Sequence, residues 1–257
     1  MNPAWYVPIG FLVGTYGTII GAGGGFILVP LLVFLFPGDG PSMVTAASLA
    51  IIFVNATSGT IAYAVQRRIS YRTGIFFAAA TIPGALLGSW LTRFIPKRVF
   101  GIVFGCLLVA VAVVLAVTRS RHRSAPGDSP APQLQTSQLV LGMGLSLFIG
   151  IFSSLVGIGG GLIHVPVLTS LFGFPLHVAT ATSHFVLVFT ALAGVVEHIL
   201  DHSWPTHLLR DALLAAGVVA GAQLGAFLSR KIAATWIVVG LAAALAVVGV
   251  RLILTTL

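Results

Sequence analysis

Two glycine-rich elements of the chain have the residue types and the spacing to bind an anion. They consist of Gly21, Gly23, Gly24 and Gly25, followed by Pro30, and of Gly157, Gly159, Gly160 and Gly161, followed by Pro166. Each lies inside a long apolar segment, where a glycine-rich break frees backbone N–H groups at the start of the next half-helix. Because the positive end of a half-helix attracts anions, the pattern predicts two anion sites near the middle of a membrane.

The two elements belong to an internal repeat. Residues 14–30 and 150–166 are identical at eight pairs, from Gly14 with Gly150 to Pro30 with Pro166. Composition alone would give roughly one or two matches. An alternative is that the glycines only let helices pack closely, but three successive glycines exceed what close packing needs. Duplicated broken helices indicate the binding site of a transporter.

Hydroxyl side chains recur at the start of the apolar segment that follows each element. Thr45 and Ser48 correspond to Thr180 and Ser183. Hydroxyl groups at helix starts can donate to anionic oxygens without a fixed positive charge. The alternative is that they bond the carbonyl four residues earlier or a neighbouring helix, as hydroxyls in membrane helices commonly do. We expect these four residues to bind the substrate together with the glycines.

Two histidines lie deep in apolar sequence, at positions where the other half of the repeat has leucine. His164 corresponds to Leu28, and His184 corresponds to Leu49. An ionisable side chain inside a membrane is a functional candidate by default. Each histidine could donate to an anion while neutral or carry a coupled proton. The alternative is a neutral histidine bonded to backbone.

A third group of histidines accompanies two carboxylates. His198, His202 and His207 lie beside Glu197 and Asp201. Imidazole and carboxylate groups together could form a metal site. Their place at the end of an apolar segment instead favours solvated loop residues, and we expect neither a metal nor any other cofactor.

The composition is that of a polytopic membrane protein. Hydrophobic residues make up 58% of the 257 residues and charged residues only 7%, and the mean hydropathy is +1.09. This leaves too little polar surface to cover a soluble globule. The net charge of +8 comes from short basic clusters between apolar runs, which is typical of membrane topology signals and argues against nucleic acid as a partner.

The apolar segments define two halves. Eight segments run over residues 7–36, 43–65, 73–92, 98–118, 138–172, 177–200, 208–229 and 232–256, most of them near the ~20 residues that a bilayer helix needs. Residues 119–137 form a polar linker rich in Ser, Pro and Arg. We therefore predict an all-α fold with transmembrane repeats over 1–118 and 138–257, joined by the linker 119–137.

The first segment of each half can either cross the membrane as a broken span or turn back as a re-entrant hairpin. Hairpins would leave three crossings in each half and make the halves inverted repeats. The basic residues 67–72, 119–123 and 230–231 then share one side, opposite Asp39, Glu197 and Asp201, and only the cluster of Arg93, Lys97 and Arg98 falls on the other side. Fully crossing segments would divide the basic clusters between the two sides. The positive-inside tendency favours inverted repeats with a cytoplasmic linker and both termini outside.

The doubled GxGGG-x4-P element, each copy followed by a Thr/Ser-bearing helix, resembles the sulfite exporter (TauE/SafE) family of bacterial transporters. The resemblance covers essentially the whole chain. It implies a multi-pass protein of the cytoplasmic (inner) membrane that exports sulfite or small organosulfonates such as sulfoacetate. It also implies a secondary mechanism without a nucleotide-binding domain, and the sequence contains no GxxxxGK[ST] phosphate-binding motif.

The sequence thus predicts a secondary exporter that works by alternating access, with a small sulfur-containing anion and the lipid bilayer as its partners. The chain could instead transport another small anion or act as a non-transporting scaffold. An intramembrane hydrolase using Ser153, Ser154 or Ser183 with a histidine is disfavoured. Ser183 and its neighbour His184 point about 100° apart on a helix, and no GxSxG motif is present. We predict that the chain is not an enzyme; oligomer formation is left open.

Overall fold

The computed structural model describes residues 3–118, 132–201, 207–229 and 234–256, and no strand occurs in these ranges. After a short 3-10 turn, η1 (Pro3–Trp5), the helices are α1 (Tyr6–Ile20), α2 (Gly25–Leu35), α3 (Pro41–Val65), α4 (Tyr71–Thr92), α5 (Lys97–Thr118), α6 (Thr136–Val156), α7 (Gly161–Pro166) with its π-helical continuation η3 (Val167–Leu171), α8 (Leu176–Leu200), α9 (Leu208–Leu228) and α10 (Ala234–Thr256). The fold is all-α, as the composition predicts.

Five of these helices, α3, α4, α6, α8 and α9, are each long and apolar enough to cross a bilayer. They have 21 to 25 residues, which at about 1.5 Å per residue span the ~30 Å hydrocarbon core. Large apolar side chains such as Val65 and Phe148 point outward and are 80% and 60% exposed. Such a surface is stable against lipid but not against water. The chain is a multi-pass membrane protein.

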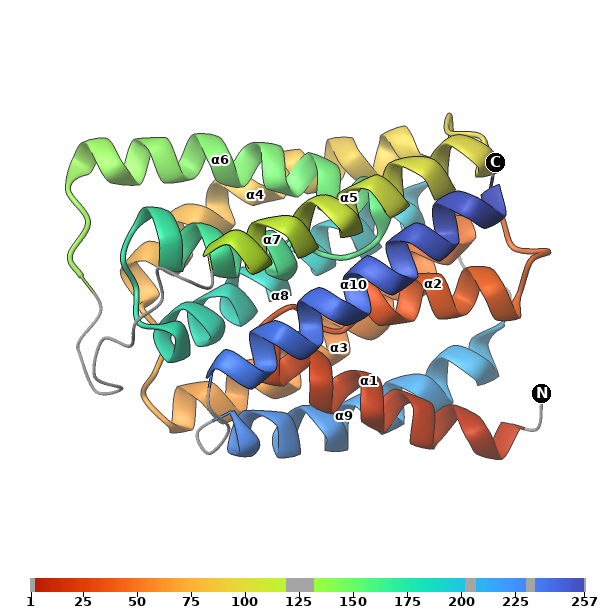
Figure 1. The fold of residues 1–257 in the computed structure, drawn as a ribbon, viewed down its shortest axis with the longest axis horizontal. Helices are drawn as coiled ribbons and strands as arrows, with labels where there is room; N and C mark the ends of the chain where they lie inside the picture. The colour runs from red at the N-terminus through yellow and green to blue at the C-terminus, as the bar shows by residue number, and fades with distance from the viewer. Residues whose placement is uncertain (1–2, 119–131, 202–206, 230–233, 257) are drawn as a thin grey trace.

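The first broken segment turns back on itself. Helix α1 enters from one end of the molecule and α2 returns to the same end (Figure 1). The rings of Tyr6, at the start of α1, and Phe36, just after α2, lie 6.4 Å apart. We call this end face A, and the opposite end, where α6 begins at Thr136, face B.

The second broken segment is a hairpin that enters from face B. Helix α6 runs inward, and α7 with η3 returns (Figure 1). Gly142, in the first half of α6, faces Phe172 at the end of η3: a Cβ on this glycine would lie 3.2 Å from Phe172 Cζ. Leu139 and Phe172 also share one buried apolar cluster. The two hairpins therefore enter the molecule from opposite faces.

The helices of the first half pack mainly against those of the second. Helix α1 packs on α9 and α6 packs on α4, while α3 pairs with α8 and α5 with α10. Glycines allow the close approach: a Cβ on Gly150 would lie 2.5 Å from the carbonyl oxygen of Thr81, and one on Gly14 would lie 2.7 Å from that of Val218. The pairing of α1 with α9 corresponds to that of α6 with α4 when the two halves are exchanged, and the pairs α3 with α8 and α5 with α10 correspond to themselves. Inverted repeats would require this correspondence.

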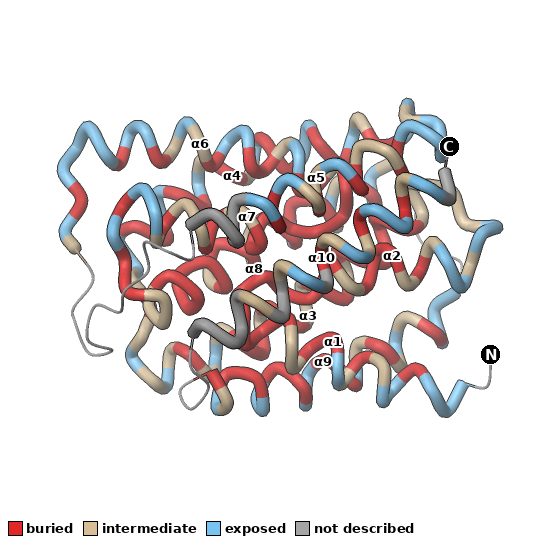
Figure 2. Tube along the Cα trace, in the orientation of Figure 1, coloured by how far each residue is buried: buried red, intermediate tan, exposed pale blue. Residues whose placement is uncertain are grey.

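The core lies where the two hairpins meet. Figure 2 shows that the buried residues are concentrated in the middle of the molecule. Along the outer helices α6 and α9, buried residues alternate with exposed ones. The largest buried cluster joins Phe26 and Leu28 of α2 to Leu162 of α7 across the two halves. The fold thus places both glycine-rich breaks at its centre.

The hairpin topology can be tested by cysteine labelling in a Cys106→Ala background. Trp5→Cys and Gly38→Cys should react with a membrane-impermeant maleimide from one side of the membrane, because both residues are exposed at face A. Gln135→Cys and Leu171→Cys, exposed at face B, should react only from the other side. Labelling of Trp5→Cys and Gly38→Cys from opposite sides would show that α1 and α2 cross in one direction.

Candidate anion site

The two breaks are tight turns that only glycine forms easily. We call residues 21–25 the first glycine turn and residues 157–161 the second. Three glycines in each have positive φ angles: 83°, 72° and 82° at Gly21, Gly23 and Gly24, and 77°, 80° and 93° at Gly157, Gly159 and Gly160. This left-handed conformation costs other residues roughly 1–2 kcal/mol each. The spacing of the glycines is therefore set by the backbone of the turns.

The two glycine turns contact each other directly. A Cβ on Gly25 would lie 2.8 Å from Ile158 Cα, and one on Gly161 would lie 2.9 Å from Ala22 Cα. Gly23 and Gly159 both face Ile52, near the middle of α3: their Cβ positions lie 3.1 and 3.2 Å from its Cγ2. Any side chain larger than hydrogen would separate the turns.

Each turn leaves a run of backbone N–H groups free. Among the described residues, the N–H groups of Gly24, Gly25 and Phe26 have no backbone acceptor, and neither do those of Gly160, Gly161 and Leu162. All six residues are buried. They are the first N–H groups of α2 and α7, where the helix dipole is positive. This arrangement can hold an anion by backbone hydrogen bonds alone.

The expected hydroxyl residues lie against the turns, and their protons are already donated to carbonyls. Ser48 donates to Gly157 O at 2.7 Å, and Ser183 is 3.1 Å from Gly21 O and 3.2 Å from Gly161 O. Both serines thus join one half of the chain to the other.

The two threonines bond the starts of their own helices. Thr180 donates to Leu176 O at 2.6 Å, and Thr45 lies 3.0 Å from Pro41 O. Both hydroxyls thus bond the carbonyl four residues earlier, which is the alternative to substrate binding. Thr45 nevertheless touches the second turn, because a Cβ on Gly157 would lie 3.0 Å from Thr45 Cα.

His184 belongs to a buried polar network beside the first glycine turn. Its Nε2 lies 3.3 Å from Thr18 Oγ1, and Thr18 in turn donates to Asn55 Oδ1 at 3.3 Å. The Asn55 amide donates to Gly23 O at 3.0 Å, and Tyr63 OH donates to Thr18 O at 2.7 Å. His184 Nδ1 has no partner among the described residues.

His164 has the bonding of a satisfied neutral histidine. Its Nδ1 lies 3.1 Å from Gly160 O, and its Nε2 lies 3.2 Å from Ser146 Oγ. Because a carbonyl oxygen only accepts, Nδ1 carries the proton and Nε2 accepts from the serine. This is the backbone-bonded alternative for the histidine, and it holds the start of α7 against α6.

The expectation that His198 is a solvated loop residue is wrong. Its side chain is only 1% exposed, and its Nε2 lies 3.3 Å from Thr45 Oγ1. The helical pattern of α8 continues to Leu200, which puts His198 on the face of Gly194, four residues earlier, against α3. His207 is exposed on face A, and His202 lies outside the described residues.

Ion pairs join the two halves at face A, and sequence reasoning missed them. Arg93 of α4 contacts Asp201 and lies 3.6 Å from Glu197. Arg210 of α9, only 5% exposed, lies 3.0 Å from Asp39. The nearest available signal was that Arg93 and Arg210 each border a long apolar run. The pairing itself depends on contacts between residues more than 100 positions apart.

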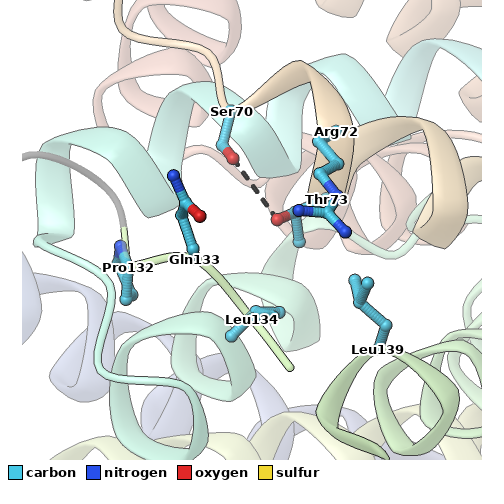
Figure 3. A pocket seen from close by; sticks show the side chains of 7 residues that line it. All are labelled: Ser70, Arg72, Thr73, Pro132, Gln133, Leu134 and Leu139. Carbon is cyan, nitrogen blue, oxygen red and sulfur yellow. Dashed lines mark hydrogen bonds between the residues drawn. The ribbon is translucent and has the colours of Figure 1, made fainter. Parts of the chain in front are cut away.

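A separate cavity of about 200 Å³ opens at face B. It is lined by Ser70, Arg72, Thr73, Pro132, Gln133, Leu134 and Leu139 (Figure 3). Ser70, in the wall of this cavity, contacts α8: its backbone N–H donates to Thr182 Oγ1 at 3.0 Å. No residue of either glycine turn is part of its wall.

The fold and the two buried turns define a polytopic α-helical membrane protein with a central polar site. The sulfite exporter TauE/SafE family model matches residues 6–252. The probable membrane transporter protein YunE of Bacillus subtilis is 30% identical, over 96% of both chains. A probable membrane transporter protein of Methanocaldococcus jannaschii is 25% identical over 96% of this chain and 93% of its own. No solved structure matches the chain.

The chain therefore belongs to the sulfite exporter TauE/SafE family. The resemblance drawn from the doubled glycine element is confirmed. The family places the chain among membrane transporters. Neither the family match nor the names of these relatives identifies the residues that bind the substrate.

The bond from Ser48 to the second glycine turn can be tested by its effect on stability. Ser48→Ala should lower the free energy of unfolding by ~1–3 kcal/mol, because it leaves the Gly157 carbonyl buried without that donor. The control is Thr57→Val, which removes a half-buried hydroxyl bonded only to Phe53 O of its own helix. The two variants should differ in unfolding temperature in detergent. Equal unfolding temperatures would contradict a role of Ser48 in joining the halves.

Proposed function

We propose that this protein is a secondary transporter of a small sulfur-containing oxyanion, which binds between the two glycine turns. The observation that carries the proposal is the pair of buried N–H runs, Gly24 to Phe26 and Gly160 to Leu162, at helix starts that meet in the middle of the molecule. Unpaired N–H groups at this depth are costly unless they bind something. An oxyanion can accept several of them at once.

The surroundings of the turns favour weak, reversible binding. Residues 7–38, 40–66 and 132–196 contain no Asp, Glu, Lys or Arg, so the anion would be held by neutral donors and helix dipoles. A bound anion must also leave, and a buried arginine or lysine would retain it. Neutral donors therefore suit a transporter better than a permanent binding protein.

The substrate class rests on the family. Its description names sulfite export, whereas the curated relatives are named only as probable membrane transporters. Sulfite and organosulfonates such as sulfoacetate share the tetrahedral or pyramidal oxygen groups that converging N–H donors can bind. We propose export of these anions across the cytoplasmic membrane, without a cofactor and without an enzymatic reaction.

We further propose that the two halves, residues 1–118 and 138–257, are inverted repeats that move against each other to alternate access. Both turns are buried from either face, so access requires the halves to separate. The bonds from Ser48 to Gly157 and from Ser183 to Gly21 cross between the halves. When the halves separate, these serine hydroxyls become available to the anion.

The glycine turns can be tested with a variant pair matched in backbone strain. Gly160 and Gly173 have φ angles of 93° and 69°. A Cβ on Gly160 would lie 3.1 Å from Ser153 Oγ, whereas one on Gly173 meets nothing within 4 Å. Gly160→Ala should reduce binding of sulfite and sulfoacetate to purified protein at least about tenfold, and Gly173→Ala should leave it unchanged. Calorimetric titration in detergent measures both.

The outcomes separate the proposed function from its alternatives. Equal binding to both variants would contradict a site at the second glycine turn. Saturable binding of a different small anion, lost in Gly160→Ala, would keep the site and change the substrate. Binding of no small anion by the wild-type protein would favour a non-transporting scaffold.

A further inference from the structure

A buried histidine and a partly buried glutamate near the face A end of α8 have unpartnered atoms that face each other. His198 Nδ1 and Glu197 Oε2 lie 3.8 Å apart, and the two side chains are 1% and 12% exposed. Neither atom has a hydrogen-bond partner among the described residues. Buried polar atoms without partners are rare and costly, so this pair requires a physical explanation.

The bonding of Thr45 fixes which histidine nitrogen carries the proton. Thr45 Oγ1 lies 3.0 Å from the carbonyl oxygens of Pro41 and Ser42, and its single proton is donated to them. Its oxygen therefore accepts from His198 Nε2, 3.3 Å away. A neutral imidazole with its proton on Nε2 has a lone pair on Nδ1. Nδ1 and Glu197 Oε2 are thus two acceptors that face each other with no proton between them.

We propose that His198 and Glu197 together form a binding site for one proton, and that this proton controls passage of the transported anion between the second glycine turn and face A. The proposal rests on the proposed transport function. At 3.8 Å the two atoms are slightly too far apart for a hydrogen bond. A proton on Nδ1 would attract Oε2, and a small shift of either side chain would then satisfy both unpartnered atoms. It belongs to the pair and not to either residue alone.

The charges around the pair explain why a proton would control an anion. The groups around His198 are Glu197 of α8, Asp201 just after α8, Arg93 of α4 and the uncharged Thr45 of α3. With neutral His198, the two carboxylates and one guanidinium carry one net negative charge. One bound proton cancels it. An anion that passes between the second glycine turn and face A is therefore repelled when the His198–Glu197 pair is unprotonated, and is not repelled when the pair holds a proton.

Two further buried hydroxyls lie near the second glycine turn and near this pair. Ser154 lies in the last turn of α6 before Gly157, and Ser89 Oγ lies 2.9 Å from a Cβ placed on Gly194, one helical turn from His198. Both serines are buried, and neither hydroxyl has a partner among the described residues. They can donate to water or to a passing anion.

The other two buried histidines are poorer proton sites. Both ring nitrogens of His164 are already bonded as a neutral imidazole requires. His184 Nδ1 is unpartnered, but residues 40–66 and 132–196 around it in sequence contain no carboxylate. A proton there would leave a buried charge without a counter-ion. His198 is the buried histidine with a carboxylate beside it in the described part of the chain.

The proposal is tested first by the pH profile of sulfoacetate flux in proteoliposomes, between about pH 5 and pH 8. Wild-type flux should rise as the pH falls. Glu197→Gln should be fast at every pH, because the glutamine amide donates to Nδ1 and the negative charge is gone, while Asp201 still pairs with Arg93. His198→Gln should be slow at every pH. The two variants should differ at least about fivefold at high pH.

His207→Gln is the matched control, because this histidine also lies on face A near a carboxylate, with its Nε2 3.7 Å from Asp39, but is exposed. It should keep the wild-type profile. A wild-type profile in Glu197→Gln and His198→Gln would overturn the proposal. So would loss of the pH dependence in His184→Gln alone.

A second measurement does not depend on transport. Glu197→Gln should raise the unfolding temperature of the purified protein at neutral pH, because it supplies the missing hydrogen between the two buried side chains. The difference from wild type should shrink as the pH falls. Glu197→Gln also removes the contact with Arg93, so the pH dependence of the difference is the decisive result. A difference from wild type that does not change with pH would overturn the proton site. If no variant transports an anion, the proposed function fails, and this measurement still decides whether the pair binds a proton.

Discussion

The structure depends on one constraint: backbone N–H groups deep in a membrane must find an acceptor. A continuous helix meets this demand internally, but a broken one cannot. The glycine turns break two helices at the centre of the molecule and leave six buried N–H groups without backbone acceptors in the described ranges. The hairpins, their burial and their close mutual contact all serve to keep these groups away from lipid.

The packing around the turns follows from the same constraint. The turns touch backbone to backbone at Gly25 and Gly161, and α3 and α8 contribute Ser48 and Ser183, whose hydroxyls bond turn carbonyls of the opposite half. Ile52 packs against the midpoint of both turns. Polar bonds and apolar contacts thus hold a site that contains no fixed charge of its own. Where the chain is described, charged pairs lie toward the faces, as in the pair of Arg93 with Asp201.

Much of this arrangement could be predicted from the sequence because the repeat marks it twice. The glycine spacing predicted both breaks, and the apolar runs predicted the helices within a few residues. The loop charges favoured hairpins over crossing segments, but the contacts that close each hairpin, such as that of Tyr6 with Phe36, are long-range and not encoded in local patterns. His198 was misjudged because a charged helix end resembles a loop in sequence, whereas α8 continues past it and packs it against Thr45.

The central claim is that backbone N–H groups of the two glycine turns bind the anion. Its most direct test is solid-state NMR of ¹⁵N-glycine-labelled protein in lipid vesicles, titrated with sulfoacetate. The account predicts saturable shifts of the amide signals of Gly24, Gly25, Gly160 and Gly161, with Gly38 and Gly173 unchanged. Unchanged signals from the two turns at sulfoacetate concentrations that saturate transport would contradict it.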